Sequence, residues 1–434
     1  MADSDLYVII PIGKRGQLTG EGCMPRPLKL LVTLYSASPF AQSIPLNGYK
    51  YASGLQKAAD IKVIAHKRDR KSLSQSDLKD NLFFAGSKRL ADLMRGIGCF
   101  LFKGRWSLIS LFDFWDYLYF DLDCLRLARK LHKEHGFDAI LRMTPTTPQW
   151  PSLIYKAGLP VITGPHNGGM TWPEGFRYLA GRDGTAESFR AFGKLTHFLY
   201  RDLDKYSRIL CANRQCAEVF GEGCKDRILE ISENGVDRVF APAENSGDAT
   251  KLLYVGRLIS CRCLDLLLKA LARLPEKVRL TLVGDGPIRG ELEGLSEKLG
   301  LRQRVEFAGQ VRQSETTAFM EKAGVFVFPS VRDSGGLALL EAMSHALPVV
   351  VAKWGGPFQY VGDDYGISLP VGSPQELENG LVGSIERLLA DRNYGRELGL
   401  KAREKIQNEF LWESKARLFV EIAEETLRMC RQKA

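Results

Sequence analysis

Short runs of apolar, β-branched residues alternate with longer helical stretches along this chain, and the pattern occurs twice. In the first half, six such runs predict buried strands, at 28–35, 61–66, 138–141, 159–163, 207–211 and 227–231. In the second half, the corresponding runs lie at 251–256, 278–284, 304–307, 325–328, 348–351 and 367–370. Near-continuous apolar strands are typical of a parallel sheet that helices cover on both faces. Each half therefore predicts a doubly wound, Rossmann-like α/β domain.

The division into domains follows from the length and from one polar stretch. A chain of 434 residues is too long for one compact core. The polar, turn-rich stretch at 242–250 directly precedes a strong strand and predicts the join. We therefore expect domains at 1–245 and 246–434, with charge-rich C-terminal helices, beginning near Leu381, that are able to cross back to the first domain.

The net charge and the cysteine content limit which cellular compartment and which binding partners the sequence fits. The net charge of +9 fits an anionic substrate or an anionic membrane surface and does not require nucleic acid. No apolar run reaches the length of about 18 residues that a membrane span needs, and the first residues do not resemble a signal peptide. Of the nine cysteines, only Cys261 and Cys263 form a close pair, so the chain predicts reduced thiols and a cytoplasmic protein.

The segment 81–122 interrupts the alternation with many aromatic residues among cations. Its cations are Lys88, Arg89, Arg95, Lys103 and Arg105. Apolar rings interleaved with Lys and Arg are typical of peripheral membrane helices, and core helices of large proteins look similar. The pattern leaves both interpretations open: a cover for the first sheet, or an anchor at an anionic membrane surface.

The strongest chemical signals lie in the second half. Strand 251–255 ends in Gly256-Arg257, and Arg262 begins the next helix, so two guanidiniums are placed where they can pair with phosphate oxygens. Surface arginines alone also account for this spacing.

A second signal follows the strand at 325–328. The sequence Asp333-Ser334-Gly335-Gly336 opens a helix that carries Glu341 among apolar neighbours. Glycines at a helix N-terminus let backbone N–H groups approach a phosphate, and the two carboxylates are suited to holding sugar hydroxyls. A plain helix N-cap is the alternative explanation for Asp333-Ser334.

Taken together and in order, these motifs resemble retaining glycosyltransferase family four. The resemblance rests on GRL with a following basic residue, VGDGP (283–287), FAGQV (307–311), the carboxylate–GG–LLEAM stretch and GGPFQYV (355–361). In the first half it includes ITGPHNGG (162–169) and ISENGVD (231–237). The resemblance implies the GT-B fold, in which two Rossmann-like domains face a central cleft and the second binds a nucleotide sugar.

The resemblance also implies roles for the matching residues. Arg257 and Arg262 would bind the donor diphosphate in place of a metal ion, Glu341 the ribose hydroxyls, and Asp333 the hydroxyls of the donor sugar. His166 would lie near that sugar, which completes the predicted catalytic set. The nucleotide-sugar site would comprise Gly256, Arg257, Arg262, Gly284, Gly309, Val311, Ser334, Gly335, Gly336, Leu337 and Glu341. A first-domain loop would face it with Gly164, His166, Asn167, Gly168 and Gly169.

The sequence departs from the family pattern at four places. Asp333 replaces the first glutamate of the usual Glu-x7-Glu spacing, and Arg262 replaces a lysine, with Cys263 where a glycine normally follows. The first-domain histidine before a proline is absent from 142–145, and Gln359 replaces a glutamate. These changes keep the residues expected to bind phosphate, but they leave the identity of the donor sugar undetermined.

Three other protein classes fit parts of the pattern. A dinucleotide-dependent oxidoreductase would use Gly284 and Gly286, but the next glycine, Gly290, is one residue too far. A GT-B epimerase would act on a nucleotide sugar without an acceptor. A metal-dependent transferase would use one of the Asp-Leu-Asp triplets at 121–123 and 202–204, which we interpret as solvated helix faces.

The sequence thus predicts a metal-independent, retaining glycosyltransferase that moves a sugar from a UDP- or GDP-sugar to a saccharide or lipid-linked acceptor. The expected setting is cell-surface polysaccharide or glycolipid synthesis, in the cytoplasm and peripherally at the inner face of the membrane. No cofactor, metal or nucleic acid is expected. The chain does not specify the donor sugar, the acceptor, the linkage formed or the oligomeric state.

Overall fold

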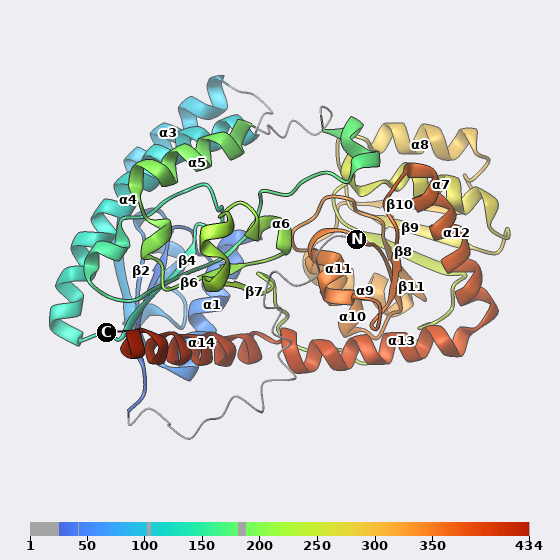
Figure 1. The fold of residues 1–434 in the computed structure, drawn as a ribbon. Coiled ribbons are helices and arrows are strands. Elements are labelled where there is room, and N and C mark those ends of the chain that lie inside the picture. The colour runs from blue at the N-terminus through green and yellow to red at the C-terminus, as the bar shows by residue number, and fades with distance from the viewer. Residues whose placement is uncertain (1–25, 42, 102–105, 181–187, 434) are drawn as a thin grey trace. The chain divides into compact units, whose positions relative to one another are not determined.

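The computed structural model describes residues 26–41, 43–101, 106–180 and 188–433. Within these ranges the chain forms two compact units (Figure 1). Unit 1 is drawn from Met1–Gly169, Gly184–Glu233 and Trp412–Ala434, and unit 2 from Met170–Asp183 and Asn234–Leu411. The sequence predicts a boundary at residue 245 and C-terminal helices that are able to cross back to the first domain. The units change after residues 169, 183, 233 and 411, and Trp412–Ala434 belongs to unit 1.

Seven parallel strands form the sheet of unit 1, in the order β3-β2-β1-β4-β5-β6-β7. They are β1 (Lys29–Leu34), β2 (Asp60–His66), β3 (Leu82–Ala85), β4 (Ala139–Thr144), β5 (Val161–His166), β6 (Arg208–Cys211) and β7 (Ile228–Glu230). The chain runs outward from β1 to β3 and resumes on the other side of β1 with β4. The strand order therefore reverses between β1 and β4, and such reversals are where doubly wound sheets bind ligands.

Helices cover both faces of this sheet. On one face α1 (Ile44–Ala58) packs against α14 (Trp412–Lys433), and Tyr51 makes edge contacts with Trp412 and Phe419. On the other face α4 (Trp106–His135) buries Tyr117 and Phe120 in a second cluster. The remaining helices of unit 1 are α2 (Arg70–Leu73), α3 (Lys88–Leu101), α5 (Ser188–Tyr200) and α6 (Arg214–Ala217).

Six parallel strands form the sheet of unit 2, in the order β10-β9-β8-β11-β12-β13. They are β8 (Lys251–Val255), β9 (Arg279–Val283), β10 (Val305–Gly309), β11 (Val325–Phe328), β12 (Val349–Ala352) and β13 (Ile367–Leu369). The helices are α7 (Leu264–Arg273), α8 (Arg289–Lys298), α9 (Gln313–Lys322), α10 (Leu337–Ser344), α11 (Gly355–Val361), α12 (Pro374–Ala390) and α13 (Arg392–Lys405). Here the strand order reverses between β8 and β11.

Both sheets confirm the predicted fold class, because each half carries a parallel, doubly wound sheet. Two details differ from expectation. Residues 82–85, inside the aromatic segment, form the edge strand β3 beside β2. Residues 242–250 are not a free join: Ala243 and Gly247 donate backbone hydrogen bonds to His345 and Gly324, which tie this stretch into unit 2.

Among the described residues, none of the helices combines the length and the apolar character that crossing a bilayer would need.

Candidate functional site

The carboxyl ends of β8, β9 and β10 meet in a layer of glycines. Gly256 donates a backbone hydrogen bond to Val283 (2.9 Å), and Gly284 donates one to Gly309 (2.8 Å). Gly284 has φ +133°, and a Cβ there would lie 2.0 Å from the Gly256 carbonyl oxygen, so only glycine fits. This close stacking leaves the backbone of three adjacent turns accessible at one edge of the sheet.

Arg257 follows this glycine layer at the end of β8. Its side chain is exposed, and within the described ranges it has no hydrogen bond or ion pair. An unpaired guanidinium at a strand end is available to an anion, because it would give up no existing partner on binding.

Arg262 lies close by and, unlike Arg257, is already paired. Its guanidinium forms an ion pair with Asp333 and donates to Ser330 Oγ (2.9 Å), and it stacks 5.0 Å over the ring of Phe328. Burial works against the charged guanidinium, but Asp333, Tyr254 and Cys261 together outweigh it, so the pKa of Arg262 is raised. The pair joins the loop after β8 to the loop after β11, across the point where the strand order reverses.

The loop after β11 is braced before it enters α10. Asp333 Oδ1 accepts from the Gly335 N–H (3.0 Å), and its carbonyl accepts from the Gly356 N–H at the start of α11 (3.0 Å). The helix N-cap is Gly336, with φ +73° and no side-chain cap, so Asp333 is not the N-cap of α10. Ser334 and Leu337 are half-buried on either side of the two glycines. The N-terminus of α10 follows the carboxyl end of β11, and a helix N-terminus favours anions.

Glu341 lies one turn further along α10 and is half-buried. It accepts a hydrogen bond from Gln313 Nε2 of α9 (2.8 Å). Burial raises the pKa of Glu341, the Gln313 hydrogen bond lowers it in part, and Asp237 raises it again. Sequence analysis missed Gln313, and a polar residue two positions after Val311 gives no signal by itself.

The predicted first-domain loop lies in unit 1, after β5. Asn167 donates to the Glu233 carboxylate and, through its backbone, to the Thr146 carbonyl (2.6 Å). His166 is buried, with Nε2 2.9 Å from Thr163 Oγ1. Burial, together with Arg142 and His197, lowers the pKa of His166 well below its ordinary value, so its ring is neutral. Its place beside a donor sugar, like that of Gly164, Gly168 and Gly169, stays a prediction.

Unit 1 has a cavity of about 650 Å³ at its own strand-order reversal, between the ends of β1 and β4. Tyr35 and Trp150 give it aromatic walls, and Arg68, Asp69 and Asp113 give it charged groups of both signs. Burial raises the pKa of both Asp69 and Asp113. Aromatic walls with carboxylate and guanidinium groups suit a ligand rich in hydroxyls. Sequence analysis did not find this site, because its residues come from distant segments.

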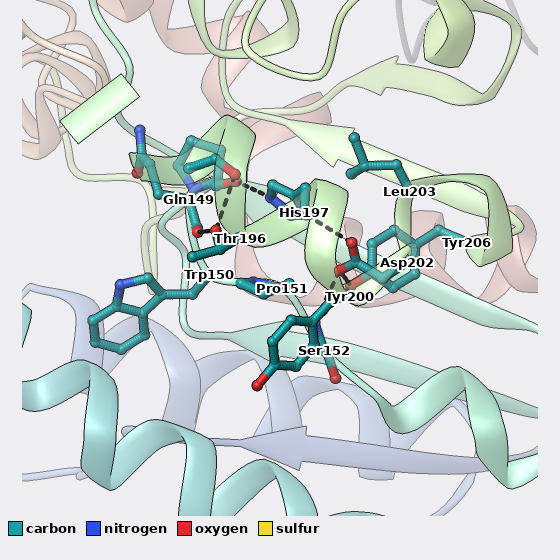
Figure 2. Close-up of polar contacts among 12 residues, drawn as sticks. Gln149, Trp150, Pro151, Ser152, Thr196, His197, Tyr200, Asp202, Leu203 and Tyr206 are labelled. Atoms are coloured by element: carbon teal, nitrogen blue, oxygen red, sulfur yellow. Dashed lines mark hydrogen bonds and ion pairs between the residues drawn. The ribbon is translucent and has the colours of Figure 1, made fainter. Parts of the chain in front are cut away.

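The two Asp-Leu-Asp triplets correct one expectation, because their leading residues are not solvated. Asp121 is buried and accepts from Leu153 N (2.7 Å), and Asp202 is buried and accepts from Ser152 N (2.9 Å). Figure 2 shows Asp202 with His197, Tyr206 and Ser152 around it. Both carboxylates therefore hold the backbone of the segment after β4.

The aromatic segment 81–122 turns out to have two faces in its described part. Phe114, Tyr117 and Phe120 are buried against the first sheet, whereas Phe100 and Trp115 are exposed. Lys103 and Arg105 lie outside the described residues. Within the described ranges the cysteines are free, and no cluster of His, Cys, Asp or Glu is arranged to hold a metal ion.

Comparison with known proteins bears directly on unit 2. Residues 237–405, which include Arg257, Arg262, Asp333 and Glu341, match the family model described as glycosyl transferases group 1. These residues form a glycosyl transferases group 1 domain. Family four, which the sequence resembles, is consistent with this group.

Three curated relatives of this glycosyl transferases group 1 domain are transferases by name. The lipopolysaccharide core biosynthesis glycosyltransferase LpsE of Rhizobium meliloti is 31% identical over 46% of this chain and 59% of its own length. The sulfoquinovosyl transferase SQD2 of Arabidopsis thaliana is 34% identical over 36% of this chain and 30% of its own. The phosphatidylinositol N-acetylglucosaminyltransferase gpi3 subunit of Schizosaccharomyces pombe is 34% identical over 38% of this chain and 37% of its own length. The match thus spans between 30% and 59% of these relatives.

Solved structures extend the likeness to nearly the whole chain, with the glycosyl transferases group 1 domain as its second part. Sucrose-phosphate synthase from Thermosynechococcus elongatus has a TM-score of 0.64 at 20% identity, covering 93% of this chain and all of that one. Anabaena HepE in complex with UDP has a TM-score of 0.60 at 16% identity, covering 92% of this chain and 100% of that one. At this identity the likeness concerns the fold alone, and it shows the predicted GT-B fold.

Proposed function

We propose that the protein is a retaining glycosyltransferase whose donor, a nucleotide sugar, binds unit 2. The observation that carries the proposal is the unpaired, exposed Arg257 beside the Arg262–Asp333 pair, at the strand-order reversal of a glycosyl transferases group 1 domain. Two guanidiniums and a helix N-terminus within one edge of the sheet suit a diphosphate. The HepE structures, which contain UDP and UDP-glucose, support the choice of donor class.

The donor residues then take separate roles. Arg257 binds the diphosphate directly, and Arg262 does so while it remains held by Asp333. Glu341, oriented by Gln313, accepts from the ribose hydroxyls, since a carboxylate only accepts hydrogen bonds when it is ionised. The turns at Gly309 and Val311 receive the base. Asp333 accepts from hydroxyls of the donor sugar with the lone pairs that Arg262 and Gly335 leave unused.

The transfer retains the anomeric configuration by attack on the front face. The acceptor hydroxyl oxygen forms a bond to the anomeric carbon while the bond from that carbon to the diphosphate oxygen breaks. The hydroxyl proton passes to the leaving phosphate oxygen, so no separate base is needed. Arg257 and Arg262 stabilise the negative charge that develops on this oxygen, which is the electrostatic work that a metal ion performs in other transferases. We therefore propose that no metal is required.

The cavity of unit 1 is the proposed acceptor site. Its mixed charges and its aromatic walls suit a saccharide ring. The names of the relatives point to acceptors on lipids, since one acts in lipopolysaccharide core synthesis and another on phosphatidylinositol. We take a lipid-linked saccharide as the acceptor, in cell-surface glycolipid or polysaccharide synthesis.

A lipid-linked acceptor would place the protein at a membrane surface. The exposed Phe100 of α3 and Trp115 of α4 lie on helices that also carry cations such as Lys88, Arg89 and Arg95. Rings and cations together favour an anionic bilayer interface, where each cation contributes about 1 kcal/mol. This supports the anchor interpretation for the outer face of the segment and the core interpretation for its inner face.

A nucleotide-sugar screen tests the proposal. Thermal shifts with UDP- and GDP-sugars identify the donor, and mass analysis of products with lipid-linked saccharides identifies the transfer. Glu341→Gln should keep the fold and lose most donor binding. Release of nucleotide or of an isomer with no acceptor present would indicate an epimerase, and an unshifted melting temperature with every nucleotide sugar would refute the donor site.

A further inference from the structure

Helix α5 presents a large apolar surface to solvent. Leu195, Phe198 and Leu199 are 55%, 74% and 66% exposed. Residues spaced three and four apart lie on one face of a helix, so these three side chains form a single stripe. Exposed large residues that stand singly are common, whereas a contiguous stripe marks an interaction surface.

The charged residues in the sequence of α5 are all cations. The sequence of α5, 188–200, contains Arg190 and Lys194 and no Asp or Glu, and the exposed Arg201 follows its last residue. An apolar face on a helix without acidic residues is typical of helices that lie in the interface of an anionic bilayer.

The opposite face of α5 is buried and polar, and it holds the segment that follows β4. Thr196 Oγ1 donates to the Gln149 carbonyl (3.0 Å). The ring of His197 lies between two acceptors, with Nε2 2.7 Å from the Pro148 carbonyl and Nδ1 2.8 Å from the Asp202 carboxylate. Figure 2 shows Thr196 and His197 directed toward this segment.

The segment so held carries one wall of the unit 1 cavity. Trp150 follows Gln149 directly, lines the cavity and stacks on Tyr117 with ring centroids 5.0 Å apart. Two residues later, Ser152 N donates to Asp202, just beyond α5 (2.9 Å). Trp150 is therefore fixed between two points that both depend on α5 and its C-terminal end.

We propose that α5 couples lipid contact to the acceptor cavity. Its apolar stripe enters the interface of an anionic bilayer, and its polar face then fixes the position of Trp150 in the cavity wall. The occupant of the stripe is the bilayer itself. This inference rests on the proposed function for the acceptor role of the cavity. Its physical basis is that Thr196 and His197 transmit any displacement of the helix to the backbone of residues 148 and 149.

Vesicle binding tests the first half of the inference. The full chain is sedimented with phosphatidylcholine vesicles, with and without phosphatidylglycerol. Phe198→Ser with Leu199→Ser should weaken binding to the anionic vesicles by about tenfold, since both side chains lose their apolar surface. Leu400→Ser, at a residue of α13 that is 43% exposed, is the matched control and should bind as the parent does. Equal binding by the double variant and the control overturns the inference.

Hydrogen exchange tests the coupling. Anionic vesicles should slow amide exchange at residues 146–152 of the parent several-fold. Thr196→Val should keep vesicle binding and lose much of this response, and adding His197→Gln should abolish it, with melting curves confirming that both variants fold. Unchanged exchange in the parent overturns the coupling, and concentration-dependent self-association through Phe198 without vesicles overturns the bilayer as occupant.

The same measurements separate this inference from the proposed function. Neither uses a nucleotide sugar, so Glu341→Gln should bind vesicles and respond at 146–152 as the parent does. A parent that transfers sugar but shows no vesicle-dependent exchange would refute the role of α5 and leave the donor site standing.

Discussion

Replacing Arg257 by alanine is the cleanest test of the donor site, because the structure separates its effect on binding from its effect on folding. The side chain is exposed and, within the described ranges, has no hydrogen bond or ion pair. Its removal should therefore change the free energy of unfolding by no more than about 0.5 kcal/mol. Arg262→Ala would be ambiguous, because it also leaves the poorly exposed Asp333 carboxylate without its partner.

The expected loss of affinity follows from the chemistry of the contact. A hydrogen bond to a charged group contributes about 1.5–3 kcal/mol, and each 1.4 kcal/mol is a factor of ten. The Kd of Arg257→Ala for the nucleotide diphosphate should thus rise by about 10- to 150-fold. Because Arg257 is exposed, the lower half of this range is expected at physiological salt.

Isothermal titration calorimetry with UDP and with GDP measures the change, and thermal melts verify the fold. Arg302→Ala is the matched control, since Arg302 is also exposed but precedes β10, at the amino end of the strand. The reasoning is refuted if Arg257→Ala binds both nucleotides within about threefold of the parent.

Three further predictions concern the donor sugar, the metal and the pH dependence of folding. Asp333→Glu lengthens a carboxylate that Arg262 and Gly335 hold. The order of donor sugars by kcat/KM should therefore change, while the Kd of the free nucleotide changes little. An unchanged order with a higher Kd for the nucleotide would assign Asp333 to the phosphates. Transfer should continue in excess chelator, and loss that magnesium or manganese restores would overturn the metal-free mechanism. Burial lowers the pKa of Lys415 from 10.5 to about 7. At a pH between these two pKa values, the unfolded chain holds a proton on Lys415 that the folded chain lacks. The free energy of unfolding therefore falls as the pH falls through this range. Lys415→Met should therefore raise the free energy of unfolding more at about pH 7 than at about pH 10, and equal gains in urea titrations would contradict this.

The sheets could be predicted from the sequence because their strands are buried on both faces, so each strand consists of a nearly continuous run of apolar residues. β3 escaped notice because it is an edge strand of half-buried residues inside an aromatic-rich segment. The stretch at 242–250 looked like a linker because its composition is polar. Its backbone, however, is hydrogen-bonded to Gly324 and His345, about 80 and 100 residues further along the chain. The composition of a stretch does not indicate hydrogen bonds to such distant residues.

For the candidate site, sequence analysis found the residues that follow strand ends and missed the contacts among them. Arg257 and Asp333 could be named because glycines and strand ends mark their positions. The ion pair between Arg262 and Asp333 spans 71 residues, and the Gln313–Glu341 hydrogen bond spans 28. Asp121 and Asp202 were misjudged for the same reason, since the backbone groups that they accept from belong to another segment.

The chain alternates between the two units, and this limits which segments related proteins can exchange. Phe176 has no exposed surface and lies in the core of unit 2, although it precedes the family-matched region by some 60 residues. Phe419 and Ile422 of α14 lie in the core of unit 1, although they follow that region. A gene segment for residues 234–411 would carry the donor loops and lack part of the interior that supports them. Recombination that alters donor choice would have to transfer residues around Phe176 as well, and it would have to keep α14 matched to α1 of the host.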